Sequence, residues 1–228
     1  MLKVENTEVF GWEAAIRGMR NPKNSWDRSD SDWEFVEDPC IINPNDEVKF
    51  VAGENDLTLM KTLAKAGDDH GKFLRFINVT VDITAPLYWW KEFDTYKVGT
   101  VANSCSTMHK LTAKEFTMDD FSHEHLTAEG ESVLAYVIDN MNAVRGLYLN
   151  YEENEEVVSQ MFPTKKDAWW QMIQLLPSSY NQKRTVQLNY AVLKNMYFAR
   201  RHHKLDEWHT LCEWMETLPY FKEICIQE

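Results

Sequence analysis

The chain has 228 residues, of which 44% are hydrophobic and 13% aromatic, so its composition is that of a folded globular protein. Its formal net charge of −12 excludes a nucleic acid polymer as the main partner, because binding a phosphate backbone requires a basic surface. No apolar run approaches the length of a membrane span, so we expect no membrane partner, and we expect no signal peptide.

The N-terminal part of the chain predicts a strand, a short helix and a long loop. Met1–Phe10 suits the strand, and Glu13–Arg20 suits the helix. Asn21–Pro39 is polar and acidic, with proline near both of its ends, which is typical of a loop. A loop of this length is either functional or only a solvated excursion of the chain.

A second helix is predicted for Asn55–Ala66. Its apolar residues recur at helical spacing, and Asp56 or Asn55 is a suitable N-cap. Gly67 follows at the position where a glycine commonly ends a helix.

The clearest strand pattern of the chain is Phe73–Thr84, where apolar residues alternate with more polar ones. Thr84 then offers a capping hydroxyl and Pro86 a suitable first-turn residue. We therefore predict that a helix over Leu87–Tyr96 follows the strand directly.

The rest of the chain predicts mainly helices. They are expected over Ala128–Leu149, Asp167–Leu176, Thr185–His202 and Leu205–Leu218. Because strands come early and helices late, we predict an α+β fold, an antiparallel sheet packed with long helices, in a single domain over residues 1–228.

The predicted helix Thr185–His202 carries polar groups on the side that otherwise reads as core. At about 100° per residue, Asn189 and Arg200 share a stripe with Leu193 and Met196, and Asn195 flanks it. An unpaired buried polar group costs about 1–3 kcal/mol. These residues are therefore either a satisfied structural network, with Arg200 paired to a carboxylate, or part of a ligand site.

Cysteine spacing bears on the compartment and on metals. Cys40, Cys105, Cys212 and Cys225 form no CxxC pair and no zinc spacing. We expect a cytoplasmic protein with free thiols and no metal site.

The segment from Leu176 to His209 resembles the C-terminal signature of the flavin-dependent thymidylate synthases, which reads roughly LP-x11-N-x-R-x3-N-x4-R. Leu176-Pro177 is followed at the family's spacing by Asn189, Asn195 and Arg200, with Ala191 in place of the middle arginine. The resemblance implies this family's fold.

An upstream segment is similar to the same family. Ala85-Pro86 leads to Thr95-Tyr96-Lys97, at the place of the family's Arg-His-Arg triplet. Thr100, Asn103 and Ser106 follow near the places of the nucleotide-loop motif.

The resemblance implies a homotetrameric enzyme that methylates carbon 5 of dUMP, a pyrimidine nucleotide. FAD supplies the hydride, and NADPH and methylenetetrahydrofolate are co-substrates. Arg200 matches the catalytic position, where a permanently charged, planar guanidinium stabilises the uracil ring as it loses a proton. The implied substrate-binding residues are Glu92, Thr95, Ser104, Cys105, Ser106 and Arg200. The implied cofactor-binding residues are Lys72, Tyr96, Lys97, Asn103, Asn189 and Asn195.

The chain departs from the family where cations are expected. Thr95-Tyr96-Lys97 keeps one cation of three, and Met108 and Ala191 replace two further arginines. Each charge-assisted phosphate contact contributes about 1.5–3 kcal/mol, so the loss bears directly on cofactor binding. Two alternatives to the enzyme therefore stay open: a scaffold that binds a nucleotide or a protein without flavin, and a purely structural homologue. The side-chain amides of Asn189 and Asn195 could instead be helix caps or hydrogen bonds between helices. The turn at Ser106 could be an ordinary turn.

Overall fold

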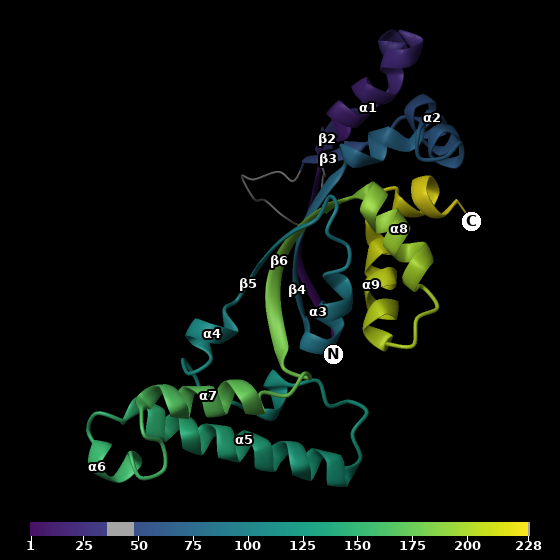
Figure 1. Ribbon diagram of the computed structural model, residues 1–228. Helices are drawn as coiled ribbons and strands as arrows, with labels where there is room; N and C mark the ends of the chain where they lie inside the picture. Colours follow the sequence, from purple (N-terminus) through teal and green to yellow (C-terminus); the bar gives the residue numbers. More distant parts are fainter. Residues whose placement is uncertain (36–47, 228) are drawn as a thin grey trace. The chain divides into compact units, whose positions relative to one another are not determined.

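The computed structural model describes residues 1–35 and 48–227, and it combines helices and strands (Figure 1). The strands are β1 Lys3–Phe10, β2 Asp32–Phe35, β3 Val48–Val51, β4 Asn78–Pro86, β5 Val101–Ser104 and β6 Asn181–Asn189. The helices are α1 Trp12–Arg20, α2 Glu54–Lys65, α3 Leu87–Phe93, α4 Thr107–Lys110, α5 Ala128–Leu149, α6 Glu155–Val158, α7 Lys165–Leu175, α8 Tyr190–Arg200 and α9 Asp206–Thr217. No helix in these described ranges is long and apolar enough to cross a membrane.

The main sheet is antiparallel and has the strand order β1-β4-β6-β5, which confirms the predicted α+β class. A separate antiparallel pair joins β2 to β3, with Trp33 opposite Phe50. The described chain forms two compact units. Unit 1 comprises Met1–Glu5, Asp82–Thr95 and Ala102–Thr185, and unit 2 comprises Asn6–Val81, Tyr96–Val101 and Val186–Glu228. The prediction of a single domain stays a prediction.

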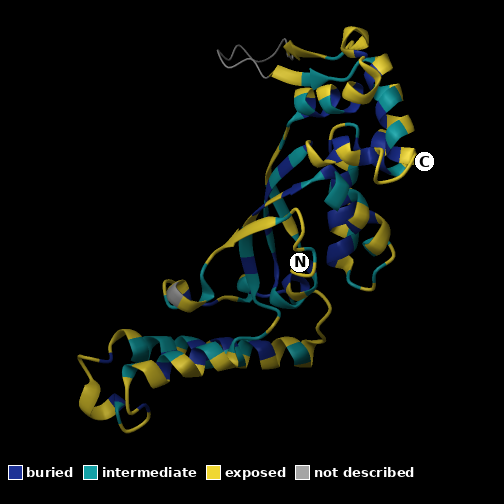
Figure 2. Ribbon diagram, turned by 45° about the horizontal axis from the view of Figure 1, so that its top comes forward, coloured by how far each residue is buried: buried dark blue, intermediate teal, exposed yellow. Residues whose placement is uncertain are grey.

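The core of unit 1 lies between α5 and α7, which run side by side (Figures 1 and 2). Leu134, Ile138 and Met141 recur at i, i+4 and i+7 on α5, so they share one face of the helix and are buried together. Thr164 and Asp167 form a reciprocal capping box that fixes the start of α7.

In unit 2, α8 packs against α9 and against the short 3₁₀ helix Gly71–Arg75. Leu193 and Met196 of α8 and Trp208 of α9 are completely buried. The ring of Tyr190 meets the Phe221 ring edge-on at 5.3 Å, and its hydroxyl donates to the Pro219 carbonyl at 2.7 Å. Helix α8 is therefore held along its length by apolar packing.

Several predicted elements are confirmed. They are the strand at Met1–Phe10 and the helices at Glu13–Arg20, Asn55–Ala66, Ala128–Leu149, Asp167–Leu176 and Leu205–Leu218. The helix predicted for Leu87–Tyr96 is also present, but it ends at Phe93.

The strand predicted for Phe73–Thr84 has different bounds. A 3₁₀ helix occupies Gly71–Arg75, and strand β4 begins only at Asn78 and continues through Pro86. Thr84 therefore lies within the strand, and its predicted role as the cap of α3 is wrong.

The helix predicted for Thr185–His202 is wrong in its first part. Strand β6 continues to Asn189, and α8 begins at Tyr190. The sequence Thr185-Val186-Gln187-Leu188 alternates exposed and buried residues, as a strand does. The alternation is short, and the helical spacing of α8 begins directly after it, so the sequence pattern favoured one continuous helix.

Two further expectations in unit 2 are corrected. Asp32–Phe35 forms strand β2 inside the segment predicted as loop, and the part of that loop beyond Phe35 lies outside the described residues. Asp56 does not cap α2, whose N-cap is Gly53. The Asp56 side chain is instead completely buried in an ion pair with Arg20.

Candidate functional site

Arg200 lies in the last turn of α8, and two aromatic residues of the same unit contact it. Its Nε donates a hydrogen bond to the Tyr96 hydroxyl at 2.9 Å. The central guanidinium carbon lies 5.5 Å from the centre of the Tyr96 ring and 4.7 Å from that of the Trp208 ring. Arg200, Tyr96 and Trp208 are called the Arg200 cluster below. The cluster places a half-buried cation against two ring faces, an arrangement that favours the charged guanidinium.

His203 borders the Arg200 cluster through Trp208. The two rings meet at 6.2 Å, and His203 Nδ1 accepts a hydrogen bond from the Leu205 backbone N–H at 3.1 Å. An accepting Nδ1 places the proton of the neutral ring on Nε2. The turn between α8 and α9 thus has a defined geometry next to Arg200.

Asn189 is the N-cap of α8. Its Oδ1 accepts from the Val192 backbone N–H at 3.1 Å, so the structural alternative considered from the sequence is realised. The segment that follows Tyr96 lies against this cap: a Cβ on Gly99, whose φ is +77°, would come within 3.3 Å of Asn189 Nδ2 and 3.1 Å of Val192 Cγ2. Glycine is therefore needed at Gly99 both for backbone conformation and for space.

Asn195 and Arg200 lie in different environments on α8, since Arg200 is half-buried against Trp208 and Asn195 is exposed. The buried residues of the helix are Tyr190, Leu193, Met196 and Tyr197, whereas Asn195 is exposed. The expectation that Asn195 lies on the apolar side is wrong, because at about 100° per residue it falls on the side of α8 opposite these buried residues.

The two predicted cofactor-binding lysines lie at the surface of unit 2. Lys72 is in the 3₁₀ helix and lies 3.9 Å from Asp69, and Lys97 follows Tyr96 directly. Both ammonium groups are accessible to a ligand, but a surface ammonium is strongly hydrated and gives only weak attraction by itself.

In unit 1, the predicted substrate residues are partly used in local structure. The Glu92 carbonyl accepts the Thr95 hydroxyl at 2.7 Å, which closes the end of α3. The Cys105 backbone donates to the Lys183 carbonyl at 3.0 Å and accepts from Gln182 Nε2 at 2.9 Å. Strand β6 therefore fixes the Cys105 turn. The side chains of Asn103, Ser104 and Cys105 are exposed and that of Ser106 is half-buried.

The sequence reading missed Arg184, a cation in unit 1. Its Nη1 donates to Asp94 Oδ1 at 2.7 Å, and its guanidinium lies 4.2 Å from the centre of the Trp90 ring. The alternating pattern of β6 is the signal that could have identified Arg184. In a strand, Arg184 is on the same face of the sheet as the buried residues Val186 and Leu188.

Trp208 was the other omission. Its spacing to Leu211, Cys212 and Met215 marks it as core of α9, which gave no reason to place it beside Arg200. Only the packing of α9 against α8 brings the two side chains together.

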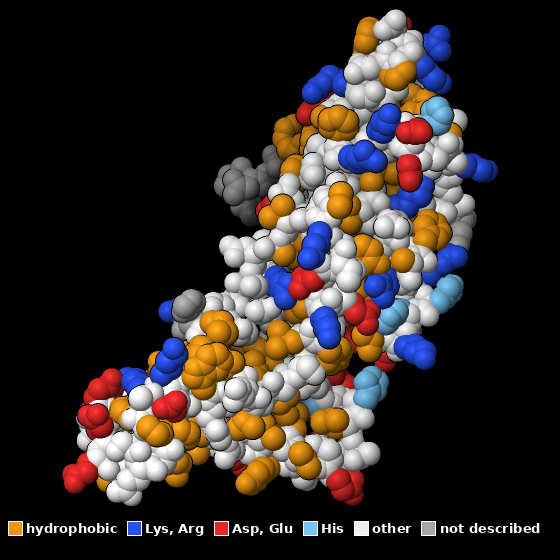
Figure 3. Space-filling view, in the orientation of Figure 1, with side chains coloured by type: hydrophobic (Ala, Val, Ile, Leu, Met, Phe, Trp, Pro, Cys, Tyr) orange, Lys and Arg blue, Asp and Glu red, His pale blue; other side chains and the backbone are white. Residues whose placement is uncertain are grey.

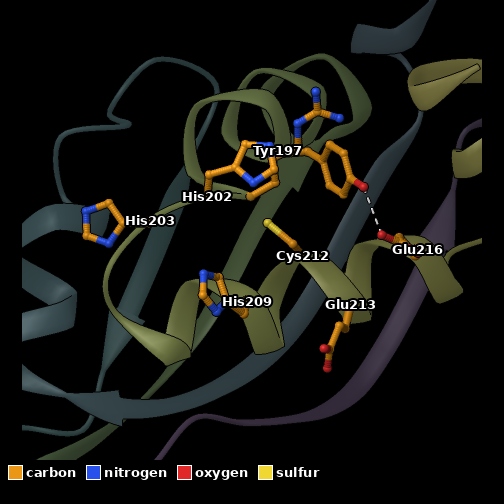
Figure 4. Close-up of a pocket in the computed structure, with 8 residues that line it drawn as sticks. Tyr197, His202, His203, His209, Cys212, Glu213 and Glu216 are labelled. Atoms are coloured by element: carbon orange, nitrogen blue, oxygen red, sulfur yellow. Dashed lines mark hydrogen bonds between the residues drawn. The ribbon is translucent and has the colours of Figure 1, made fainter. Parts of the chain in front are cut away.

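The turn after α8 and helix α9 also line an open cavity of about 850 Å³ (Figure 4). Its lining residues are Tyr197, Arg201, His202, His203, His209, Cys212, Glu213 and Glu216. Tyr197 donates to Glu216 at 2.8 Å, and hydrogen bonds from Lys222 and Tyr197 lower the pKa of Glu216. Burial raises the pKa of Cys212 to about 11, so this thiol is protonated at neutral pH and is a poor nucleophile. In the described part of the chain, no group of three metal-ligating side chains has a geometry that could hold a metal.

Two solved structures have the same fold as this chain. Both are crystal structures of the flavin-dependent thymidylate synthase ThyX from Helicobacter pylori with FAD and dUMP. One has a TM-score of 0.65 and 14% identity, and it covers 99% of this chain and 98% of its own. The other has a TM-score of 0.63 and 15% identity, with coverage of 100% and 98%. This chain thus has the fold of the flavin-dependent thymidylate synthases over almost its full length.

Sequence comparison alone gives no relative. No protein-family model and no curated protein matches the chain.

Proposed function

We propose that this protein is a divergent flavin-dependent thymidylate synthase-like enzyme. Its reaction would be the reductive methylation of carbon 5 of dUMP or a related pyrimidine nucleotide, with FAD, methylenetetrahydrofolate and NADPH. The observation that carries the proposal is the Arg200 cluster: a guanidinium at the position of the family's catalytic arginine, oriented by two aromatic side chains.

Arg200 suits the chemistry of the uracil ring. A guanidinium stays charged at every physiological pH and presents its donors in a plane, which matches the edge of a ring that becomes anionic as it loses a proton. An oriented cation is most effective when the charge it stabilises is greater in the transition state than in the bound substrate. Arg200 would therefore act on the reacting ring, and its loss should affect turnover as well as binding.

For FAD, the residues of unit 2 fit in part. Lys72 and Lys97 present exposed ammonium groups that would hold phosphates, and Asn195 presents an exposed amide that would meet a flavin edge. Tyr96 and Asn189 already have internal hydrogen-bond partners, in Arg200 and in the Val192 backbone. Bound FAD would supply the hydride in this reaction.

The alternative function is a synthase-like scaffold that binds a nucleotide or a protein partner without flavin catalysis. The internal hydrogen bonds of Tyr96 and Asn189 favour this alternative, because they engage two of the predicted cofactor-binding side chains within the protein itself. The replacement of arginines by Met108 and Ala191 points the same way.

The visible absorbance spectrum of the purified protein separates the two functions. Bound flavin gives a yellow protein, and we expect flavin absorbance after incubation with FAD and gel filtration. A colourless protein whose melting temperature rises with dUMP but not with FAD would support the scaffold. A protein that responds to neither ligand would reject both the enzyme and a scaffold that binds this nucleotide.

We also propose that the enzyme is cytoplasmic and works as a homotetramer. Large apolar side chains of unit 1 remain exposed in the single chain, among them Val133, Tyr136 and Met161, and Figure 3 shows hydrophobic side chains gathered over α5 and α7. Exposed apolar area of this kind is typical of surfaces that are covered in an assembly. Sedimentation should give the mass of a tetramer, and a stable monomer would contradict this.

A further inference from the structure

We propose that Tyr96 is a positioning residue that orients Arg200 for an anionic planar ligand and is not a cofactor ligand. The inference rests on the proposed function and assigns a different role to one of its residues. The sequence resemblance placed Tyr96 among the cofactor-binding groups, because it stands within the triplet that aligns with Arg-His-Arg. In the structure its hydroxyl oxygen accepts the hydrogen bond from Arg200 Nε at 2.9 Å.

One hydrogen bond and two aromatic rings together restrain the guanidinium of Arg200. The Tyr96 and Trp208 rings are inclined by 63° to each other with their centres 6.1 Å apart, and the guanidinium lies within 5.5 Å of both centres. Trp208 is completely buried, so its ring is a rigid support. The hydrogen bond to Tyr96 adds a directional contact at Nε. Pre-organised side chains of this kind bind with a smaller loss of entropy.

The chemistry of the acceptor explains why a tyrosine suits this task. A carboxylate at the same place would neutralise the guanidinium, as in the ion pairs of buried arginines. The phenol hydroxyl is instead an uncharged group that can both donate and accept a hydrogen bond. The Tyr96 contact therefore orients Arg200 and adds no opposite charge of its own.

The position in the chain supports the same inference. Tyr96 begins the segment Tyr96–Val101, which belongs to the same compact unit as α8 and lies against its N-terminus at Gly99. The segment therefore lies close to the α8 cap at Gly99 and contacts Arg200 through Tyr96. Tyr96 therefore presents a neutral acceptor to an arginine 104 residues further along the chain.

The test uses Tyr96→Phe, which keeps the ring and removes the acceptor. The first measurement is the solvent exchange rate of the Arg200 Nε–H in ¹⁵N spectra of the full-length protein, with the resonance assigned from Arg200→Lys. We expect exchange to be at least about fivefold faster in Tyr96→Phe. The matched control is Tyr197→Phe, which removes a phenol hydrogen bond to Glu216 instead and should leave this rate unchanged.

The second measurement is the Kd for dUMP, with FAD retention as the readout of the competing role. We expect Tyr96→Phe to raise the Kd about tenfold, equivalent to about 1.4 kcal/mol, with FAD retention unchanged. Unchanged Nε–H exchange overturns the proposal, and so does loss of FAD with unchanged dUMP affinity. Failure of the wild-type protein to bind dUMP overturns the proposed function, and with it the proposal that Tyr96 orients Arg200 for that ligand. The exchange rate still shows in that case whether Tyr96 holds Arg200.

Discussion

Two arginines of unit 2 lie in different environments. Arg20, at the end of α1, is 3% exposed and donates from Nε to Asp56 Oδ1 at 2.6 Å. Its other nitrogens donate to the carbonyls of Ser25 and Arg28, each at 3.0 Å. Arg200, at the end of α8, is half-buried, and its contacts with Tyr96 and Trp208 involve a neutral hydroxyl and two ring faces.

The two environments indicate two roles. Asp56 completes the Arg20 network, since Oδ2 also accepts from the hydroxyls of Ser29 and Ser31, both at 2.7 Å. The network joins α1, α2 and the loop between them, and the Asp56 carboxylate balances the charge of the Arg20 guanidinium. In the Arg200 cluster, a neutral hydroxyl and two aromatic rings orient a half-buried cation. We infer that Arg20 serves stability and that Arg200 serves binding.

Removing the carboxylate from the Arg20 network should have the largest effect on stability. Asp56→Asn leaves a buried guanidinium without its counter-charge, which typically costs about 3–5 kcal/mol. Urea denaturation measures the change in the free energy of unfolding. The matched control is Asp68→Asn at an exposed position, which should change it by less than about 0.5 kcal/mol. An equally small change in Asp56→Asn would contradict the structural role of the network.

The same network predicts how stability depends on pH. Burial by itself raises the pKa of Asp56, but hydrogen bonds from Ser31, Ser29 and Arg20 outweigh it, and the net pKa lies below its ordinary value of 3.8. The unfolded state therefore takes up a proton more readily, so the stabilisation is present above pH 3.8 and is lost as the pH falls through the lower folded-state pKa. Asp56→Asn should lose less stability than the wild type over this acidic range. Parallel acid titrations of the two proteins would show that Asp56 is not the responsible group.

The sequence predicted the placement of Arg20 and the selection of Arg200, but not their contacts with Asp56 and Tyr96. Helical spacing placed Arg20 on a short helix, and motif spacing selected Arg200. Asp56 follows Arg20 by 36 residues and Tyr96 precedes Arg200 by 104, so neither contact has a local signal. Asp56 was assigned to a cap because it stands at the start of a helix, where acidic residues are common.

The fold was predicted where one period dominates a long segment. Helix α5 has its predicted bounds, Ala128–Leu149, and the α+β class is confirmed. Strand β6 was missed because its alternation is short and runs directly into the helical pattern of α8. The cap at Asn189 marks this boundary; the resemblance implied a flavin contact for its amide, with a cap as the alternative.

Substitution of Asn189 should have an intermediate effect and separates those two interpretations. Asn189→Ala removes the cap of α8 and should lower the free energy of unfolding by about 1 kcal/mol. Asn189→Ser keeps a capping oxygen and should restore most of the stability. If the amide also contacts flavin, both variants lose FAD retention; if it is only a cap, Asn189→Ser retains FAD like the wild type. Full stability of Asn189→Ala would contradict the cap.

Arg200→Ala should have the smallest effect on stability of these substitutions, within about 1 kcal/mol, because a half-buried side chain loses only part of its packing. Thermal unfolding measures it. A loss as large as that of Asp56→Asn would place Arg200 with Arg20 as a structural residue and would remove the contrast between them.

Isothermal titration of dUMP into wild-type protein and Arg200→Ala, both with FAD present, tests the central claim most directly. A charge-assisted contact of about 1.5–3 kcal/mol predicts that the variant binds about 10- to 150-fold more weakly while it stays folded. Lys204→Ala, which removes an exposed cation from the same turn, should bind like the wild type. Equal affinity of the wild type and a folded Arg200→Ala would contradict the account.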